Sequence, residues 1–151
     1  MDIKASRKTL LVIAGPTAVG KTAVAIELAK KLKTEIISAD SRQFFREMTI
    51  GTAKPTKQEL GQAKHHFIDS HSITESFSVG DFEKQVLHLL DGIFQKHNTA
   101  ILVGGSGLYI KAVCEGLDEL PTSSKNIRES LNLAFKKNGI GYLQEKLKNA
   151  D

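Results

Sequence analysis

The chain has 151 residues, 40% of them hydrophobic, which is enough for one globular domain with a buried core. Its formal net charge of +4 is compatible with anionic partners but does not demand nucleic acid, because no long block of one sign exists. No signal peptide or membrane-spanning run is visible, which predicts a cytoplasmic protein that binds no membrane. The single cysteine, Cys114, excludes an internal disulfide framework, and its apolar neighbours predict a small core residue.

The first motif follows an apolar run at 10–14 and leads into a helix-like stretch at 22–30. Its residues are Gly15, Pro16, Thr17, Ala18, Val19, Gly20, Lys21 and Thr22, which match the P-loop pattern G-x-x-x-x-G-K-[ST]. The two glycines allow backbone N–H groups to face phosphate oxygens, and the positive end of the helix points to the same place. Lys21 adds a mobile cation, and the Thr22 hydroxyl suits Mg²⁺. We therefore expect these eight residues to bind a di- or triphosphate.

A second strand is predicted at 35–39, ending at Asp40. Strands that alternate with helices are parallel as a rule, and ligands collect at their carboxyl ends. Asp40 would then lie at the same edge of the sheet as the P-loop. The sequence leaves two roles open for Asp40: catalysis, or capping of a helix that could follow at 42–47.

The middle of the chain carries caps and a cluster of histidines. Thr56 and Glu59 have the spacing of a capping box for a short helix, and Lys54 before them could reach an anionic ligand or be an exposed loop lysine. His65 and His66 are adjacent on a predicted strand and so point to opposite faces. This favours a structural or surface role for the two histidines over a metal site.

Another capped helix leads to a second glycine-rich turn. Ser78 and Asp81 form a second capping-box pair, and apolar residues from 82 to 93 recur at helical spacing. A buried strand at 100–103 then runs into Gly104-Gly105-Ser106-Gly107 and a helix through 108–113, which predicts a turn at the same edge as the P-loop. Many P-loop NTPases end a strand here with an acidic Mg²⁺ ligand. The glycine at this strand end weakens an ATPase or GTPase interpretation.

The chain changes character after residue 116. A polar linker at 116–124 precedes two predicted amphipathic helices at 126–137 and 142–148, which are basic. The sequence leaves open whether this basic surface binds a partner or is only solvated. We divide the chain into a P-loop α/β core at 1–116 and the start of a helical region at 117–151.

Taken together, the motifs resemble the tRNA dimethylallyltransferase (isopentenyl-tRNA transferase) family. The similar segments are GPTAVGKT (15–22), ADSRQFF (39–45), IGTAKP (50–55), HHFID (65–69), FSVGDFE (77–83) and LVGGSGLYIKAV (102–113). In this order and spacing they cover most of the chain and are highly specific. The resemblance implies an α/β fold, with a P-loop NTPase-like parallel sheet and flanking helices, followed by part of a helical tRNA-binding insertion.

The resemblance also implies an activity, namely transfer of a dimethylallyl group from dimethylallyl diphosphate to the exocyclic N6 amine of the adenosine 3′ of the anticodon. The partners would be the anticodon stem-loop of tRNA and the prenyl diphosphate, the cofactor would be Mg²⁺ on Thr22, and the protein would be a monomer. The P-loop would hold the diphosphate, and Asp40 and Ser106 would be catalytic. The residues implied to contact tRNA are Asp40, Ser41, Arg42, Gln43, Ser106 and Arg128.

The sequence departs from the family pattern at three positions. Phe45 stands where tyrosine is usual, Thr49 where an acidic residue is common, and Ser106 where threonine is usual. Family members also continue through a further tRNA-binding segment, so we expect this chain to be a fragment or a short form with weak tRNA modification on its own. Two alternatives remain at this stage: a small-molecule P-loop kinase, disfavoured by the scarcity of arginine, and a non-catalytic phosphate- or RNA-binding fragment.

Overall fold

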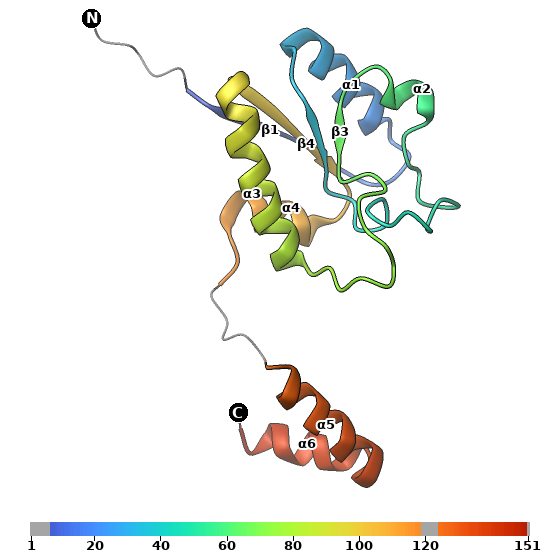
Figure 1. The fold of residues 1–151 in the computed structure, drawn as a ribbon, viewed down its shortest axis with the longest axis vertical. Helices are drawn as coiled ribbons and strands as arrows, with labels where there is room; N and C mark the ends of the chain where they lie inside the picture. Colours follow the sequence, from blue (N-terminus) through green and yellow to red (C-terminus); the bar gives the residue numbers. More distant parts are fainter. Residues whose placement is uncertain (1–6, 119–123, 151) are drawn as a thin grey trace, which may run out of the picture. The chain divides into compact units, whose positions relative to one another are not determined.

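The computed structural model describes residues 7–118 and 124–150, so part of the expected linker at 116–124 lies outside the described residues. The chain divides into two compact units, residues 1–117 and 118–151. The first unit contains, in order, β1 (Thr9–Ala14), α1 (Lys21–Leu32), β2 (Ile36–Ser38), α2 (Lys57–Leu60), β3 (His65–His66), α3 (Val79–Lys96), β4 (Thr99–Gly104) and α4 (Gly107–Glu115) (Figure 1). The second contains α5 (Lys125–Asn138) and α6 (Ile140–Lys148). Of the helices described, none is long and apolar enough to cross a bilayer.

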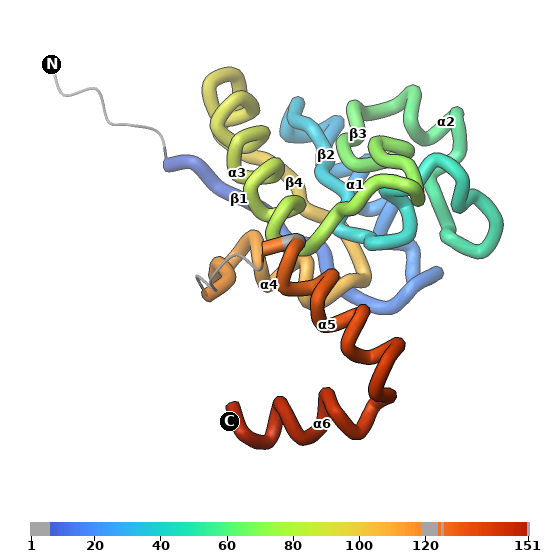
Figure 2. The backbone as a smooth tube through the Cα atoms, turned by 60° about the horizontal axis from the view of Figure 1, so that its bottom comes forward, coloured from blue at the N-terminus to red at the C-terminus, as the bar shows by residue number. Residues whose placement is uncertain are grey.

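The four strands form one sheet in the order β1-β4-β2-β3, and the pairs are all parallel. Figure 2 shows β2 and β3 side by side, with α2 beyond them. The central strand β4 is buried from Ala100 to Gly104, whereas β1 lies at one edge and exposes Val12. The near-continuous apolar run of β4 is typical of a strand covered on both faces. The predicted parallel α/β sheet is confirmed.

Helices cover both faces of the sheet, which makes three layers (Figure 1). On one face, α3 and α4 bury side chains against β2 and β4, around the ring of Phe44. On the other face, α1 buries Ala25, Ile26 and Ala29 against β2 and β4. The apolar stripe of α3 that the sequence predicted is confirmed, since Phe82, Val86, Leu90 and Ile93 are buried.

Both predicted capping boxes are present. At the start of α3, Ser78 accepts a hydrogen bond from the Asp81 N–H, and the Asp81 carboxylate accepts one from the Ser78 N–H. Thr56 and Glu59 make the same reciprocal pair at α2. These bonds satisfy N–H groups that the first helical turn leaves without partners. They fix where each helix begins, and therefore where the loops between strand and helix end.

The helix that could have followed Asp40 at 42–47 is not present, because this segment forms turns instead. Its backbone groups bond to a distant segment: the Arg46 N–H donates to the His71 carbonyl oxygen, and the His71 N–H donates to the Phe44 carbonyl oxygen. Phe44 is fully buried in the aromatic part of the core. Tertiary pairing and burial of Phe44 therefore replace the i→i−4 bonds of a helix.

Cys114 is also corrected. It lies on α4 but is exposed, not part of the core. The two residues before it, Ala112 and Val113, face the sheet and are buried. One residue further along a helix turns the side chain by about 100°, which takes Cys114 off the buried stripe.

The second unit is a pair of helices that contact each other. The two helices that the sequence predicted here are confirmed, and Gly139 between them has a φ of 75°, in the left-handed region that glycine adopts without strain. Many of the apolar side chains of this unit are exposed: Ile127, Leu133, Phe135, Ile140, Tyr142 and Leu147. The unit therefore buries little apolar surface within itself.

Candidate active site

The register of the sheet brings three turns to one edge. Ala14 pairs with Gly104, and Ser38 pairs with Val103, so β1, β2 and β4 end at the same level. The P-loop follows β1, Asp40 is the second residue after β2, and the 104–107 turn begins at the last residue of β4. The shared edge that the sequence predicted for these motifs is confirmed.

The P-loop has the backbone shape of an anion cradle. Gly20, the residue before α1, has a φ of 88°, and Ala18 has a φ of 67°, which is unusual for a residue other than glycine. Alternation into the left-handed region turns successive N–H groups toward one point. The Lys21 ammonium group donates to the Pro16 carbonyl oxygen over 2.6 Å, so the lysine side chain folds over the loop it belongs to.

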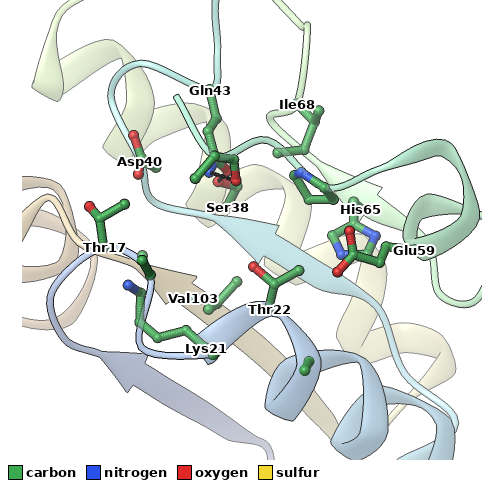
Figure 3. A pocket seen from close by; sticks show the side chains of 16 residues that line it. Thr17, Lys21, Thr22, Ser38, Asp40, Gln43, Glu59, His65, Ile68 and Val103 are labelled. Carbon is green, nitrogen blue, oxygen red and sulfur yellow. Dashed lines mark hydrogen bonds between the residues drawn. The ribbon is translucent and has the colours of Figure 1, made fainter. Parts of the chain in front are cut away.

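Two cavities open at this edge, and Thr17 and Asp40 line both of them. The first cavity, of about 290 Å³, lies between the P-loop and the segment 53–68 (Figure 3). The second cavity, of about 320 Å³, lies between the turn after β2 and the 104–107 turn. Residues that line only the first include Lys21, Thr22, Ser38, Gln43, Ala53, Pro55, Glu59, His65 and Ile68. Those that line only the second are Ser41, Arg42, Gly51, Thr52, Gly105 and Ser106.

Asp40 is half-buried at the junction of the two cavities. Its Oδ1 atom accepts a hydrogen bond from the Arg42 N–H over 3.1 Å, and its carbonyl oxygen accepts one from the Gln43 N–H. Asp40 therefore closes a turn, in place of the helix cap that was one of its two predicted roles. Within the described part of the chain, its other carboxylate oxygen has no hydrogen-bond partner, which leaves an acceptor for a ligand.

Ser106 connects the 104–107 turn to the turn after β2. Its hydroxyl oxygen accepts a hydrogen bond from the Ser41 N–H over 3.0 Å and donates to the Ser41 hydroxyl over 3.3 Å. The Ser106 N–H donates to the Ala39 carbonyl oxygen. A Cβ on Gly104 would overlap the carbonyl carbon and oxygen of Ala39, so only glycine allows this approach. Ser106 thus holds the residues on either side of Asp40 in place.

The Gln43 side chain lines the first cavity, and its amide group forms hydrogen bonds within the protein. Its Oε1 atom accepts from the Ser38 hydroxyl, and its Nε2 atom donates to the carbonyl oxygens of Thr52 and Ala53. Both donor hydrogens of the amide are therefore used. The sequence predicted contact of Gln43 with the target base. It could not show that Gln43 connects its own turn to the end of β2 and to residues 52–53.

The wall opposite the P-loop is held by an ion pair that sequence reasoning missed. The Lys54 ammonium group lies 2.6 Å from the Asp69 carboxylate and donates to the Phe45 carbonyl oxygen. The Lys54 side chain is only 7% exposed, so neither the anion contact nor the exposed lysine considered from sequence describes it. Lysine is rarely buried without such a partner. The HHFID and IGTAKP segments are joined by this pair.

Unusual backbone geometry gathers around the first cavity. Among the described residues, five other than glycine have positive φ, and four of them belong to its walls or flank a lining residue: Ala18, Ala53, Phe67 and Asp69. Each such conformation costs on the order of 1–2 kcal/mol, and it persists because surrounding contacts enforce it. Strain of this kind concentrates at functional sites. The sequence offers little signal for it, because three of these residues are alanine or phenylalanine and only Asp69 is of a type that enters this region more readily.

Two titratable groups that line the first cavity, Glu59 and His65, have pKa values shifted by their structural surroundings. Hydrogen bonds from the Thr56 N–H and hydroxyl lower the pKa of Glu59, so this carboxylate stays ionised in its capping box. Burial lowers the pKa of His65, outweighing its hydrogen bond with the Ala63 carbonyl oxygen and the nearby Glu59 charge. His65 is therefore neutral near pH 7. His66 points elsewhere and hydrogen-bonds Glu35 over 2.6 Å, as expected for adjacent residues of a strand.

The site fits the expected Mg²⁺ as an ion shared with a phosphate group. The Thr22 side chain is half-buried and lines the first cavity together with Lys21 and Asp40 (Figure 3). Within the described residues, no three His, Cys, Asp or Glu side chains are grouped to hold a metal ion. Mg²⁺ is commonly bound by one or two protein groups plus phosphate oxygens and water, which suits a single hydroxyl beside a P-loop.

Arg128, the remaining predicted tRNA contact, lies on α5 in the second unit and is exposed. Four lysines with described side chains, at 136, 137, 146 and 148, are also exposed on α5 and α6, against the acidic Glu129 and Glu145. An exposed set of this composition is compatible with a nucleic-acid contact and does not require one.

Comparison with known proteins supplies the family. A sequence model of IPP transferases matches residues 43–151. The chain therefore belongs to the IPP transferase family. Relatives within the family include a tRNA dimethylallyltransferase of Flavobacterium johnsoniae, 54% identical over 144 residues, and one of Christiangramia forsetii, 56% identical over 138 residues. These alignments cover 95% and 91% of this chain but 47% and 46% of the relatives, so the chain spans about half their length.

Solved structures agree with the family assignment. A full-length tRNA isopentenylpyrophosphate transferase from Bacillus halodurans has a TM-score of 0.72 and 40% identity, covering 96% of this chain and 48% of that one. A eukaryotic dimethylallyltransferase described as acting on tRNA has a TM-score of 0.70 and 28% identity, covering 79% of this chain and 31% of that one. The family resemblance noted in the motifs is confirmed, and the kinase alternative is not favoured.

Proposed function

We propose that this IPP transferase chain carries the diphosphate-binding and base-binding parts of a tRNA dimethylallyltransferase. The reaction is transfer of a dimethylallyl group from its diphosphate to the exocyclic N6 amine of the adenosine 3′ of the anticodon. The observation that carries the proposal is the pair of cavities that share Thr17 and Asp40. One cavity contains the phosphate cradle, the other is lined by the turns around Ser41 and Ser106, and a carboxylate lies where they meet.

The first cavity is suited to the leaving diphosphate. As the bond between carbon and oxygen breaks, negative charge grows on the diphosphate, and the cradle N–H groups, the start of α1 and Lys21 all present positive charge there. Lys21 would exchange its bond with Pro16 for the phosphate oxygens. Mg²⁺, held by Thr22, would neutralise part of the diphosphate charge when bound.

Asp40 is suited to accept the proton that the adenine amine loses. Asp40 lines both cavities, and one of its carboxylate oxygens is held by the Arg42 N–H while the other stays available. A target base must leave its stack to reach such a position, which is the usual solution for chemistry on a base. The hydrogen bonds of Ser106 with Ser41, and of Gln43 with the wall, would keep Asp40 in register with the incoming amine.

The second unit would contribute contacts to the tRNA backbone. Arg128, Lys136, Lys137, Lys146 and Lys148 are exposed cations, and phosphate contacts of this kind give affinity without sequence preference. We further propose that the protein acts as a monomer. Since the chain spans about half of its relatives, we expect weak transfer to tRNA by these residues alone.

A single-turnover assay tests the proposal. The chain, Mg²⁺ and labelled dimethylallyl diphosphate are incubated with an anticodon stem-loop RNA, and a second RNA carries guanosine at the target position as control. We expect slow labelling of the adenosine RNA alone. Asp40→Asn should lower the rate at least about a hundredfold while pyrophosphate binding stays unchanged. Lys21→Ala should weaken both transfer and binding.

Three results would count against the proposal. Labelling of the guanosine RNA at the same rate would remove the base assignment. Transfer by Asp40→Asn at the unmodified rate would remove the proton acceptor. Binding of dimethylallyl diphosphate with no transfer after long incubation would favour the non-catalytic fragment.

A further inference from the structure

We infer that the apolar wall of the first cavity, made of Ala53, Pro55 and Ile68, is a prenyl-binding surface, and that Ile68 sets the longest prenyl chain accepted. The inference rests on the proposed function for the presence of a prenyl diphosphate in this cavity. It adds which residues hold the hydrocarbon part and which one limits its length. Figure 3 shows Ile68 projecting into the cavity from the side opposite Thr22 and Lys21.

Two of the polar side chains beside this wall already have partners within the protein. Gln43 uses its amide on Ser38, Thr52 and Ala53, and Glu59 uses its carboxylate on Thr56. Away from the P-loop, the lining groups left without a partner in the described part of the chain are one Asp40 carboxylate oxygen and Nε2 of the neutral His65 ring. A ligand in this cavity would therefore meet the positive charge of Lys21 and the cradle at one end, and at the other an apolar wall beside one uncharged ring nitrogen, which suits a short prenyl diphosphate.

The position of Ile68 is fixed from both sides. Phe67 before it has a φ of 62° and packs on the rings of Phe82 and Phe44, with ring centroids 5.0 and 6.1 Å away. Asp69 after it has a φ of 52°, forms the ion pair with Lys54 and donates its N–H to the Gln43 carbonyl oxygen. Two consecutive anchors in left-handed geometry hold the residue between them, so Ile68 cannot retreat from a longer chain without releasing one of them.

The rest of the wall is pinned in the same way. Ala53 is left-handed, with a φ of 49°, and its carbonyl oxygen accepts from Gln43 over 3.0 Å. Pro55 is rigid by its own ring and precedes the capping box at Thr56. A rigid wall distinguishes chain lengths, because a cavity that cannot expand rejects the extra carbons of a longer ligand.

The test measures binding rather than transfer, using the chain as it stands. Three probes are compared by calorimetry in Mg²⁺: inorganic pyrophosphate, dimethylallyl diphosphate and geranyl diphosphate. Pyrophosphate reports the P-loop alone, and the gain from pyrophosphate to dimethylallyl diphosphate reports the apolar wall. We expect the unmodified chain to prefer dimethylallyl diphosphate to both others.

Ile68→Ala should move the ratio of geranyl to dimethylallyl affinity toward geranyl by about tenfold, because pocket methylene groups are worth factors of this size. Pyrophosphate affinity should stay constant, which shows that the variant is folded. Ile68→Phe should weaken dimethylallyl diphosphate and again spare pyrophosphate. Ile73→Ala is the matched control: it removes an isoleucine that is 58% exposed and outside the cavity, and all three affinities should be unchanged.

If Ile68→Ala lowers pyrophosphate affinity through misfolding, the milder Ile68→Val takes its place and should give a smaller shift in the same direction. An unchanged geranyl-to-dimethylallyl ratio in a variant that still binds pyrophosphate would overturn the inference. So would equal affinity of the unmodified chain for pyrophosphate and dimethylallyl diphosphate. Neither result touches the transfer assay with Asp40→Asn, so failure of the inference and failure of the proposed function remain distinguishable.

Discussion

Gly104 is the residue on which the meeting of β2 and β4 depends. The carbonyl group of Ala39 occupies the space that a Cβ on Gly104 would need, and the Ala39 N–H donates to the Val103 carbonyl oxygen over 2.7 Å. Asp40 follows Ala39 directly, so the glycine also decides how far the carboxylate lies from the 104–107 turn. The absence of a side chain at Gly104 therefore helps to position the side chain of Asp40.

The variant Gly104→Ala should therefore lower the free energy of unfolding by about 3 kcal/mol, which is the upper range for overpacking, because backbone atoms must shift. Gly92→Ala is a matched control within α3, where an added Cβ meets no described atom within 4 Å. Replacing a glycine inside a helix by alanine should raise stability by about 0.5–1 kcal/mol. Urea unfolding of both variants checks the pair, and equal effects would contradict the role given to Gly104.

The Glu35 carboxylate, one residue before β2, links β2 to β3 by a hydrogen bond with His66. Burial alone would raise the pKa of Glu35, but hydrogen bonds from His66 and Lys64, with their charges, outweigh it and hold the pKa below its ordinary 4.5. The Glu35 side chain is 16% exposed, and the bond to His66 measures 2.6 Å. The two strands pair over only two residues, so this contact adds a side-chain link to a short ladder.

Because the pKa of Glu35 is lower in the folded chain than in the unfolded one, its stabilisation is present above pH 4.5 and is lost as the pH falls through the folded value. Glu35→Gln should thus be about 1 kcal/mol less stable than the unmodified chain at pH 7, with the gap narrowing below pH 4.5. Glu75→Gln removes a half-exposed pair with Arg46 and should change stability by less than about 0.5 kcal/mol. Urea unfolding from pH 3 to 7 measures both, and a gap that widens on acidification would refute the assignment.

The two units of the molecule differ in how stable the fold of each would be on its own. The first contains both apolar clusters around the sheet, whereas α6 buries no residue and α5 leaves Ile127, Leu133 and Phe135 exposed. Helices of 14 and 9 residues are marginal in water without a packed face. The two helices accordingly have more apolar side chains on their amphipathic faces than they bury against each other.

A peptide of residues 118–151 should consequently show little helix by circular dichroism and no cooperative thermal transition. Residues 1–117 alone should unfold cooperatively, because their apolar clusters are internal to that unit. A sharp melting transition of the isolated peptide would contradict this division of stability.

The sequence by itself determined the motifs and most of the elements. The P-loop, both capping boxes, the parallel alternation and the edge shared by Asp40 and the 104–107 turn all follow from local spacing and from the handedness of strand–helix units. The tertiary structure alone decided what lies opposite the P-loop. The turns at 42–47, the buried Lys54–Asp69 pair and the left-handed residues around Ile68 depend on contacts between segments far apart in the chain. Such contacts cannot be predicted from local conformational propensity. A residue's own preference is worth only roughly 1 kcal/mol, and contacts with distant segments can outweigh it.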